Sequence, residues 1–242
     1  MSPTPPARQW HSPLTKTLKQ WRVARKRRRK WRQALKAFPL PVDIEKELSG
    51  IINEIDFYWT TAEKQTFIAN LIMTHQLKNA VEIGVYTGGS FIPQVVAMKR
   101  TNGVATGIDP YSPEEAEQSE NIELLRTIKS RTLTPDREAL YRTLLALIDR
   151  HGLSSHCKIL RMTSNEAAKH IGDGIDFLHI DGNHDRLRVS EDIANYVPKV
   201  AVGGFVVMDD INWGTIAPLY ADLKKQMKPV FETDKWGCCQ KI

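Results

Sequence analysis

Short apolar runs alternate with longer stretches in which apolar residues recur every three or four positions, and this alternation fills most of the chain after residue 78. Runs of the first kind are typical of buried strands, and stretches of the second kind have the period of a helix. Strands are predicted at 80–85, 104–108, 158–162, 175–180 and 205–208. Helices are predicted between and after them, at 91–99, 135–151, 165–171, 189–197 and 215–227. Repeated strand–helix units indicate a parallel sheet with helices on both faces.

Two segments depart from this alternation. Residues 229–233 and 237–241 flank the turn-like sequence Asp-Lys-Trp-Gly and predict a closing antiparallel hairpin. Residues 112–134 are polar and separate a strand from the next helix. An insertion of this length is either a lid or substrate loop, or a solvated surface loop, and the sequence leaves both open.

Helical periodicity also covers the first part of the chain. At 14–38 an apolar stripe runs along one side, and prolines then end the segment; the stripe consists of Trp21, Ala24, Trp31, Leu35 and Phe38. A second helix is predicted from about residue 43, and a third follows a capping-box pattern at 60–63. We therefore divide the chain into an arm (1–42) and a domain (43–242). Within the domain, 43–77 form N-terminal helices and 78–242 form the α/β core.

The charge distribution separates the arm from the domain. The chain has 34 Lys and Arg against 28 Asp and Glu, a net charge of +6. Residues 1–42 hold 12 of the basic residues and no acidic residue, so the domain carries −6. The predicted helix at 14–38 is basic and has an aromatic stripe, which indicates binding to an anionic membrane surface. Nucleic-acid binding and a solvated tail without a partner are the alternatives, but phosphate binding alone does not require the stripe.

The remaining composition concerns the compartment. The three cysteines show no metal-type spacing, and adjacent Cys238 and Cys239 are poorly suited to pair, which fits a reducing compartment. No apolar run reaches the length of a membrane span, and no apolar segment of a secretory signal follows the N-terminal charge. We expect a cytoplasmic protein, either free or peripheral at the inner face of the membrane.

Carboxylates end two of the predicted strands. Asp181 ends one, with His184 three residues later, and Asp209 and Asp210 end another. In a parallel sheet these ends share one edge, where ligands bind. Three carboxylates there repel one another unless a cation lies among them, and Mg²⁺ or another hard divalent ion would meet that need. His184 is then a candidate general base, whereas His179, inside the apolar run, is expected to pack rather than to bind a ligand.

A glycine-rich turn follows the first strand. Residues 82–90 read Glu-Ile-Gly-Val-Tyr-Thr-Gly-Gly-Ser, so the backbone can approach a ligand closely at the start of a helix. The turn lacks the Gly-x-Gly-x-x-Gly spacing of nicotinamide sites and the Gly-Lys-Ser/Thr of phosphate loops. Asp109 ends the second strand, where an acid commonly accepts from two ribose hydroxyls. Together these features predict a ligand with a ribose and without a pyrophosphate.

These motifs resemble those of the class I S-adenosylmethionine (SAM) dependent methyltransferases. Residues 82–90 are similar to the first motif of the metal-dependent caffeoyl-CoA and catechol O-methyltransferases. The motifs at 107–112, 178–184 and 203–213 are closer still to the bacterial macrocin and other sugar O-methyltransferases. The catechol-like branch generally has asparagine at the position of Asp210 and no histidine matching His184, which favours the sugar-type branch. The resemblance covers residues 78–242, and the arm lies outside it.

The resemblance implies a fold and a set of roles. The fold would be Rossmann-like, with a mostly parallel seven-stranded sheet, helices on both faces and a C-terminal antiparallel hairpin. Asp109 would hold the ribose diol, and Thr163 and Ser164 would border the adenine. The full SAM-binding set would be Glu82, Gly84, Tyr86, Gly88, Ser90, Asp109, Thr163, Ser164 and Asp181. The Mg²⁺ ligands would be Asp181, Asp209 and Asp210.

The resemblance also implies an activity. Methyl transfer from SAM to a hydroxyl of a small molecule, sugar or glycoconjugate would use Mg²⁺ to anchor and acidify the acceptor. His184 would be the general base, with Asp181 as the second catalytic residue. The alternatives are an inactive SAM-fold protein that binds membrane or nucleic acid through the arm, or an RNA methyltransferase. The presence of Asp181, His184, Asp209 and Asp210 together argues against an inactive protein. The acidic charge of the domain makes it a poor surface for RNA. The sequence leaves open whether the protein forms a homo-oligomer.

Overall fold

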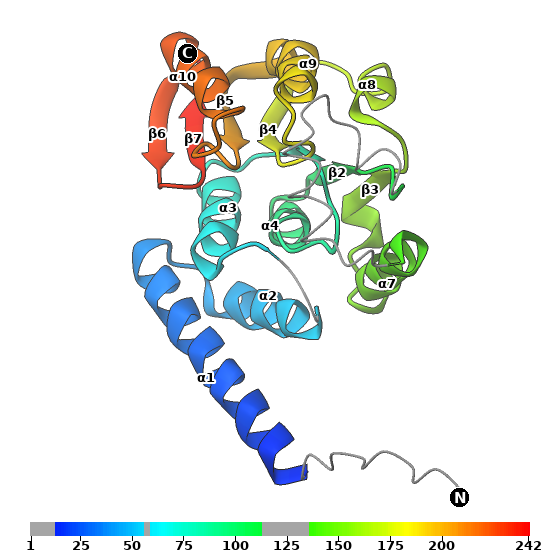
Figure 1. Cartoon of the computed structure of the whole chain (residues 1–242), viewed down its shortest axis with the longest axis vertical. Helices are drawn as coiled ribbons and strands as arrows, with labels where there is room; N and C mark the ends of the chain where they lie inside the picture. The colour runs from blue at the N-terminus through cyan, green and yellow to red at the C-terminus, as the bar shows by residue number, and fades with distance from the viewer. Residues whose placement is uncertain (1–12, 56–58, 113–135) are drawn as a thin grey trace, which may run out of the picture.

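A seven-stranded sheet forms the centre of the molecule (Figure 1). The structure, a computed structural model, describes residues 13–55, 59–112 and 136–242, with side chains from residue 25 on. The predicted insertion at 112–134 therefore falls almost wholly outside the described residues, as do the side chains of Trp21 and Ala24. The strands are β1 (Asn79–Ile83), β2 (Val104–Ile108), β3 (Cys157–Leu160), β4 (Ile175–Ile180), β5 (Val200–Met208), β6 (Lys228–Glu232) and β7 (Gly237–Gln240).

The strand order is β3-β2-β1-β4-β5-β7-β6. Strands β1 to β5 pair in parallel, and β7 runs antiparallel to both β5 and β6. The order reverses between β1 and β4, which places a ligand crevice beyond the C-terminal ends of those two strands. The predicted Rossmann-like sheet and its closing hairpin are confirmed.

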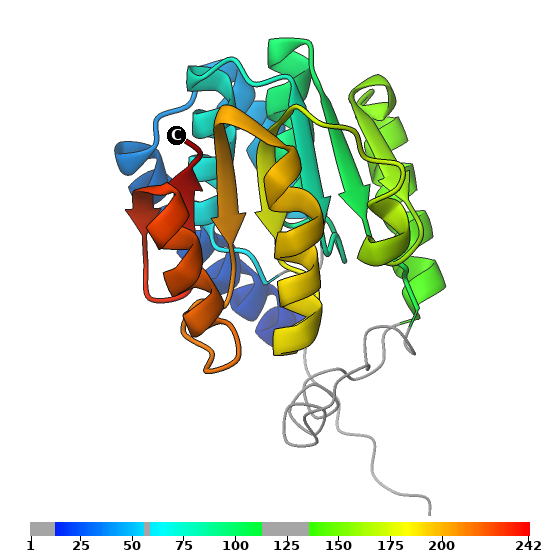
Figure 2. The ribbon, with the colours of Figure 1, turned by 90° about the horizontal axis from the view of Figure 1, so that it is seen from above.

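Helices cover both faces of the sheet (Figure 2). They are α1 (Pro13–Ala37), α2 (Val42–Glu54), α3 (Ala62–Thr74), α4 (Phe91–Thr101), α7 (Arg137–Arg150), α8 (Ser164–Ala167), α9 (Arg186–Tyr196) and α10 (Ala217–Gln226). Helices α2, α3, α4 and α7 contribute to one apolar core, and α8, α9 and α10 to the other. The strands contribute side chains to both cores, because successive side chains point to opposite faces of the sheet. In β4, for example, Phe177 lies in one core and Leu178 in the other.

Two elements differ from their predicted extents by more than three residues at one end. Strand β5 begins at Val200, five residues before the predicted start, because pairing with β4 resumes on the other side of the glycine pair at 203–204. Gly203 adopts φ +84°, and the pairing of β4 with β5 shifts register between Ile175 and Phe177. Helix α8 spans only residues 164–167, whereas the prediction was 165–171.

The basic helix α1 is attached to the domain at its C-terminal end. Ala34 is buried, and Trp31 and Phe38 pack against the core that contains α2 and α3. Figure 1 shows the earlier turns of α1 projecting away from the domain. Part of the predicted stripe thus contacts the protein itself. Along the described part of the chain, no helix has the length and apolar character needed to cross a membrane.

Candidate functional site

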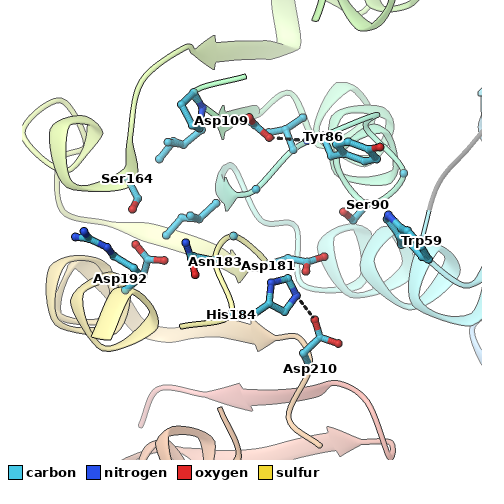
Figure 3. Close-up of a pocket in the computed structure, with 18 of the residues that line it drawn as sticks. Trp59, Tyr86, Ser90, Asp109, Ser164, Asp181, Asn183, His184, Asp192 and Asp210 are labelled. Carbon is cyan, nitrogen blue, oxygen red and sulfur yellow. Dashed lines mark hydrogen bonds and ion pairs between the residues drawn. The ribbon is translucent and has the colours of Figure 1, made fainter. Parts of the chain in front are cut away.

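A cleft of about 810 Å³ lies beyond the C-terminal ends of the parallel strands (Figure 3). It receives side chains or backbone from the segments that follow β1, β2, β3, β4 and β5. Nine of the predicted site residues line it, namely Gly84, Tyr86, Ser90, Asp109, Thr163, Ser164, Asp181, His184 and Asp210. Residues separated by more than a hundred positions in the sequence therefore meet at the predicted edge of the sheet.

Gly84 joins the first turn to the end of β4. Its φ is +90°, and a Cβ atom at this position would lie 2.0 Å from the carbonyl oxygen of Asp181. Its N–H donates to the carbonyl oxygen of Ile108 at 2.9 Å. Only a residue without a side chain allows β1 and β4 to approach so closely at the floor of the cleft.

Asp109 is held by the backbone at the end of β2. Its Oδ2 accepts from the N–H of Tyr86 and its Oδ1 from the N–H of Tyr111, both at 2.8 Å. Burial raises the pKa of Asp109, and these two hydrogen bonds offset part of the effect. Each carboxylate oxygen has a second lone pair. The residue can therefore still accept hydroxyl donors from a ligand in the cleft.

Glu82 and Gly88 lie behind the cleft wall rather than on it. Glu82 is fully buried, and its carboxylate accepts from the hydroxyl of Ser90 at 2.7 Å and from the amide of Gln94. A Cβ at Gly88 would lie 2.6 Å from the Leu144 side chain, so this glycine permits packing against α7. Glu82 thus acts on the cleft through Ser90, which does line it.

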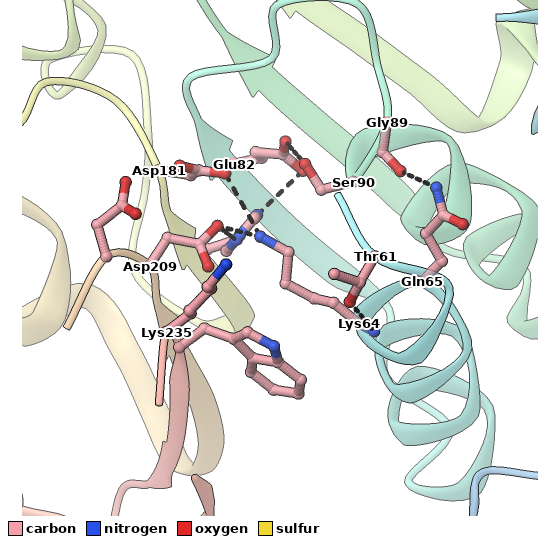
Figure 4. A network of polar contacts seen from close by, with 12 residues as sticks. Thr61, Lys64, Gln65, Glu82, Gly89, Ser90, Asp181, Asp209 and Lys235 are labelled. Atoms are coloured by element: carbon pink, nitrogen blue, oxygen red, sulfur yellow. Dashed lines mark hydrogen bonds and ion pairs between the residues drawn. The ribbon is translucent and has the colours of Figure 1, made fainter. Parts of the chain in front are cut away.

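A buried lysine lies among the carboxylates (Figure 4). The ammonium group of Lys64, in the first turn of α3, donates to Oδ2 of Asp209 and lies 3.5 Å from Oδ2 of Asp181. Burial by itself would lower the pKa of Lys64, but attraction to Asp209 and Asp181 outweighs it, and the net shift is upward. Burial opposes the charge of Asp209 as well, yet Lys64 holds the pKa of Asp209 far below its usual range.

His179 completes this cluster from within β4. Its Nε2 lies 3.2 Å from Oδ2 of Asp209, and its Nδ1 lies 3.4 Å from Oε2 of Glu82. Burial would lower the pKa of His179, but these carboxylates raise it to about 9. The residue is fully buried, as predicted, but among charged groups rather than in an apolar setting.

The predicted Mg²⁺ ligands Asp181, Asp209 and Asp210 line one small pocket together with His184, but Asp210 is not part of the tightest cluster. Among the described residues, the group whose atoms lie within 4.8 Å of one another and could hold a metal is His179, Asp181 and Asp209. Asp210 lies beyond the end of β5 with a left-handed backbone (φ +51°), and its carboxylate is directed to His184. Its Oδ2 lies 2.6 Å from Nε2 of His184.

The position of Lys64 also fits a divalent ion poorly. An ion of charge +2 about 3 Å from the ammonium would be repelled by roughly 11 kcal/mol at an effective dielectric constant of ~20. The oxygen atoms that would face the ion already face Lys64. As arranged, these residues do not fit Mg²⁺ between Asp181 and Asp209.

His184 and Asp210 form a pair at the rim of the cleft. The imidazole of His184 also lies against the indole of Trp213, with ring centroids 4.7 Å apart. When Asp210 accepts from Nε2–H, the neutral imidazole presents Nδ1 as its proton acceptor. The pair therefore has the composition of an oriented general base.

Comparison with known proteins places this geometry in a family. The sequence profile of a family described as "Methyltransferase domain" matches residues 81–211, which is more than half of the chain. The chain belongs to this methyltransferase family. The match begins in β1 and ends just after Asp210, so it includes all the strand ends that form the cleft. A search of curated proteins gives no match.

Solved structures share the fold of this methyltransferase. The S-adenosylhomocysteine (SAH) bound methyltransferase PaMTH1 of Podospora anserina aligns with a TM-score of 0.60 at 9% identity, over 99% of this chain and 100% of that one. The O-methyltransferase TomG of Streptomyces achromogenes, solved with SAM, gives 0.57 at 12% identity, over 84% and 91%. The O-methyltransferase NovP gives 0.56 at 15% identity, over 81% and 80%. At these identities the likeness shows the fold alone.

The methyltransferase has two site residues that the sequence reasoning missed. Lys64 follows the capping threonine of α3 and shares a helix face with Phe67, Ile68 and Leu71, so a lysine on an apolar stripe was the available signal. Asp192 in α9 lines the cleft, is 2% exposed, and its Oδ1 has no hydrogen-bond partner among the described residues. Burial raises the pKa of Asp192 to about 6.

The methyltransferase positions Thr163 and Ser164 at the end of β3. The Thr163 hydroxyl is occupied in the capping box of α8 with Glu166, at 2.8 Å from Oε2. The hydroxyl group of Ser164 lies against Asp192, and this hydrogen bond offsets part of the upward shift in the pKa of Asp192. Ser164 and Asp192 thus form one polar corner of the cleft (Figure 3).

Proposed function

We propose that the protein is a SAM-dependent O-methyltransferase that acts on a hydroxyl of a small molecule, sugar or glycoconjugate. One observation carries the proposal: a single cleft contains both a nucleoside-type site, Gly84 with Asp109, and a proton acceptor, His184 with Asp210. Family membership and the SAM or SAH bound in the PaMTH1 and TomG structures support this donor.

The cleft residues suit SAM by type and placement. The backbone at Gly84 can lie against the ligand, Asp109 can accept from the ribose hydroxyls, and the corner of Ser164 and Asp192 can receive the adenine. Asp181 offers a carboxylate toward the cationic part of the donor. When bound, SAM supplies an electrophilic methyl group on its sulfonium.

His184 and Asp210 serve the acceptor. His184 takes the proton of the acceptor hydroxyl at Nδ1, while Asp210 holds Nε2–H and stabilises the imidazolium that forms. A positioned base of this kind contributes about 10²–10⁴ in rate. Trp213 packs against the imidazole and limits its rotation.

The acceptor class rests on two supports. The motifs at 178–184 and 203–213 resemble those of sugar O-methyltransferases. Trp59 is 66% exposed at the cleft wall, and with Trp213 it offers flat faces on which a ring-shaped acceptor can lie. The relative TomG is involved in tomaymycin synthesis, which supports a small-molecule acceptor.

For the arm we propose attachment to an anionic membrane surface, with the protein cytoplasmic and peripheral. Exposed basic side chains on the projecting part of α1 support this, among them Lys26, Arg28, Arg29 and Lys30. Since Trp31 packs on the domain, the charged side chains and the turns before residue 25 would carry the contact. Nucleic-acid binding by the arm, an RNA substrate and an inactive scaffold stay the alternatives.

Two measurements test the function. Calorimetry should show SAH binding to the purified protein, and this binding should weaken in Asp109→Ala. Extract from a strain that lacks the gene, supplied with protein and SAM, should contain products heavier by one methylene unit. Absence of SAH binding would overturn the proposal, and methylated RNA as the sole product would replace the acceptor class.

A further inference from the structure

We propose that Lys64 is the resident cation of this site, in the place that the sequence assigns to Mg²⁺, so that the protein transfers methyl groups without a divalent metal. The proposal rests on the proposed function, because it concerns how the same site works. Lys64 is a positioning residue here: it does not line the cleft, but it contacts Asp181, which does.

The first support is the location of the ammonium group. It lies between the ends of β4 and β5, where it donates to Asp209 and is 3.5 Å from Asp181. The side chain of Lys64 is 6% exposed, so its charge has lost almost all contact with water. A charge buried to this degree is tolerated only when opposite charges surround it. The two carboxylates meet that requirement, and the lysine in turn cancels part of their mutual repulsion.

The second support is that the groups around Asp181 and Asp209 do not complete a Mg²⁺ ligand set. Mg²⁺ requires several oxygen ligands in near-octahedral geometry. Asp210, the third carboxylate predicted to supply one, is engaged by His184. The third group beside Asp181 and Asp209 is an imidazole, His179, and Mg²⁺ prefers oxygen to nitrogen. The site therefore has the charge balance of an ion-pair cluster and lacks the ligand set of a magnesium site.

The third support is that the backbone fixes Lys64 in place. Its N–H donates to the capping hydroxyl of Thr61 at 3.2 Å, which defines the start of α3. The next residue, Gln65, donates from its side-chain amide to the carbonyl of Gly89 at 3.0 Å. Helix α3 is thus tied to the glycine-rich turn by one residue and to the strand ends by its neighbour (Figure 4). Lys64 consequently sets where the Asp181 carboxylate stands in the cleft.

Metal binding provides a test that does not depend on turnover. Mn²⁺ would be titrated into metal-stripped wild type, Lys64→Met and Lys199→Met, with free Mn²⁺ followed by electron paramagnetic resonance. Methionine removes the charge at similar length. Lys199 is the matched control, because its ammonium group binds the carbonyls of Ala168 and Ile171 rather than carboxylates.

We expect Lys64→Met to bind Mn²⁺ at this site at least about tenfold more tightly than the wild type and Lys199→Met, since two carboxylates then lack a cation. Mn²⁺ should raise the melting temperature of Lys64→Met and leave that of the wild type unchanged. If Lys64→Met does not fold, Lys64→Gln is the second neutral variant, and the same gain of Mn²⁺ binding is expected in it.

Two results of the Mn²⁺ titration would overturn the proposal. One is stoichiometric Mn²⁺ binding by the wild type that disappears in Asp209→Asn; the other is a folded Lys64→Met that gains no Mn²⁺ binding. Turnover of the wild type should also survive treatment with a chelator. Loss of turnover on chelation with SAH binding intact would refute the metal-independent site alone, whereas absent SAH binding would refute the proposed function itself.

Discussion

Replacing Gly84 by alanine tests the architecture of the cleft floor most directly. At φ +90° any side chain costs about 1–2 kcal/mol, because its Cβ crowds the neighbouring backbone. The added Cβ would also lie 2.0 Å from the Asp181 carbonyl oxygen and 2.8 Å from Cα of Gly182. Both contacts are with backbone and cannot be relieved by a side-chain rotation. Overpacking of this kind adds about 1–3 kcal/mol.

Gly174 supplies a matched control. Its φ is +89°, but a Cβ there would meet nothing within 4 Å. Gly174→Ala should therefore cost only the conformational part, about 1–2 kcal/mol, and Gly84→Ala about 2–5 kcal/mol in total. In a chain of this size each kcal/mol lowers the melting temperature by about 2–4 °C. Since domains are stable by about 5–15 kcal/mol, both variants should still fold.

The functional consequence separates the two variants further. To accept the new Cβ, the Asp181 carbonyl must move by about 1 Å, and a displacement of that size in a catalytic site can cost about 10² in rate. Calorimetry with SAH and thermal melting would be measured on both variants. We expect Gly174→Ala to bind SAH like the wild type and Gly84→Ala to bind it weakly. Equal melting temperatures together with equal SAH affinities would refute the close approach of β1 to β4.

Three further predictions concern other parts of the molecule. His184→Ala should lower kcat by about 10²–10⁴ with SAH affinity unchanged, and Asp210→Asn should lower kcat less, because a mispaired imidazole remains; equal SAH affinity with undiminished kcat would exclude the pair as the base. Asp192→Ala should weaken SAH binding but leave binding of an analogue with a 6-oxo group in place of the adenine amino group nearly unaffected, as seen by calorimetry. Changing Lys26, Arg28, Arg29 and Lys30 of the arm to glutamine should weaken binding to anionic vesicles by roughly 4 kcal/mol, while methyl transfer to a soluble acceptor continues; sedimentation with vesicles and with RNA would tell the two surfaces apart.

The alternation of strands and helices was sufficient to predict the fold and the edge of the sheet that carries the cleft. The ends of β4 and β5 were located from apolar runs that stop at carboxylates, and this placed Asp181 and His184 in one site. The start of β5 could not be located in the same way, because the apolar run begins after Gly203 and Gly204, whereas the strand continues on the other side of an irregularity at Gly203.

The cation at the site is where sequence reasoning was incomplete. The sequence indicates that the carboxylates require a positive charge nearby. It does not indicate that Lys64 lies beside them, because Lys64 is 145 residues from Asp209 and reaches it only through the packing of α3. Likewise, adjacent Asp209 and Asp210 look like two ligands of one ion, but Asp209 is paired with Lys64 and Asp210 with His184.

The adjacent cysteines of β7, Cys238 and Cys239, show how the alternation of side chains along a strand affects their chemistry. Cys238 contacts the core beneath α3, and Cys239 contacts the core beneath α10, so the two sulfur atoms lie in different layers although their residues are neighbours. Both residues are fully buried, and burial raises the pKa of each thiol, which keeps the reactive thiolate scarce in the folded protein. Oxidation cannot join them without dismantling the sheet. Each thiol becomes open to reagents only when its own layer separates from the strand, so the chain carries an independent reporter for each half of its interior.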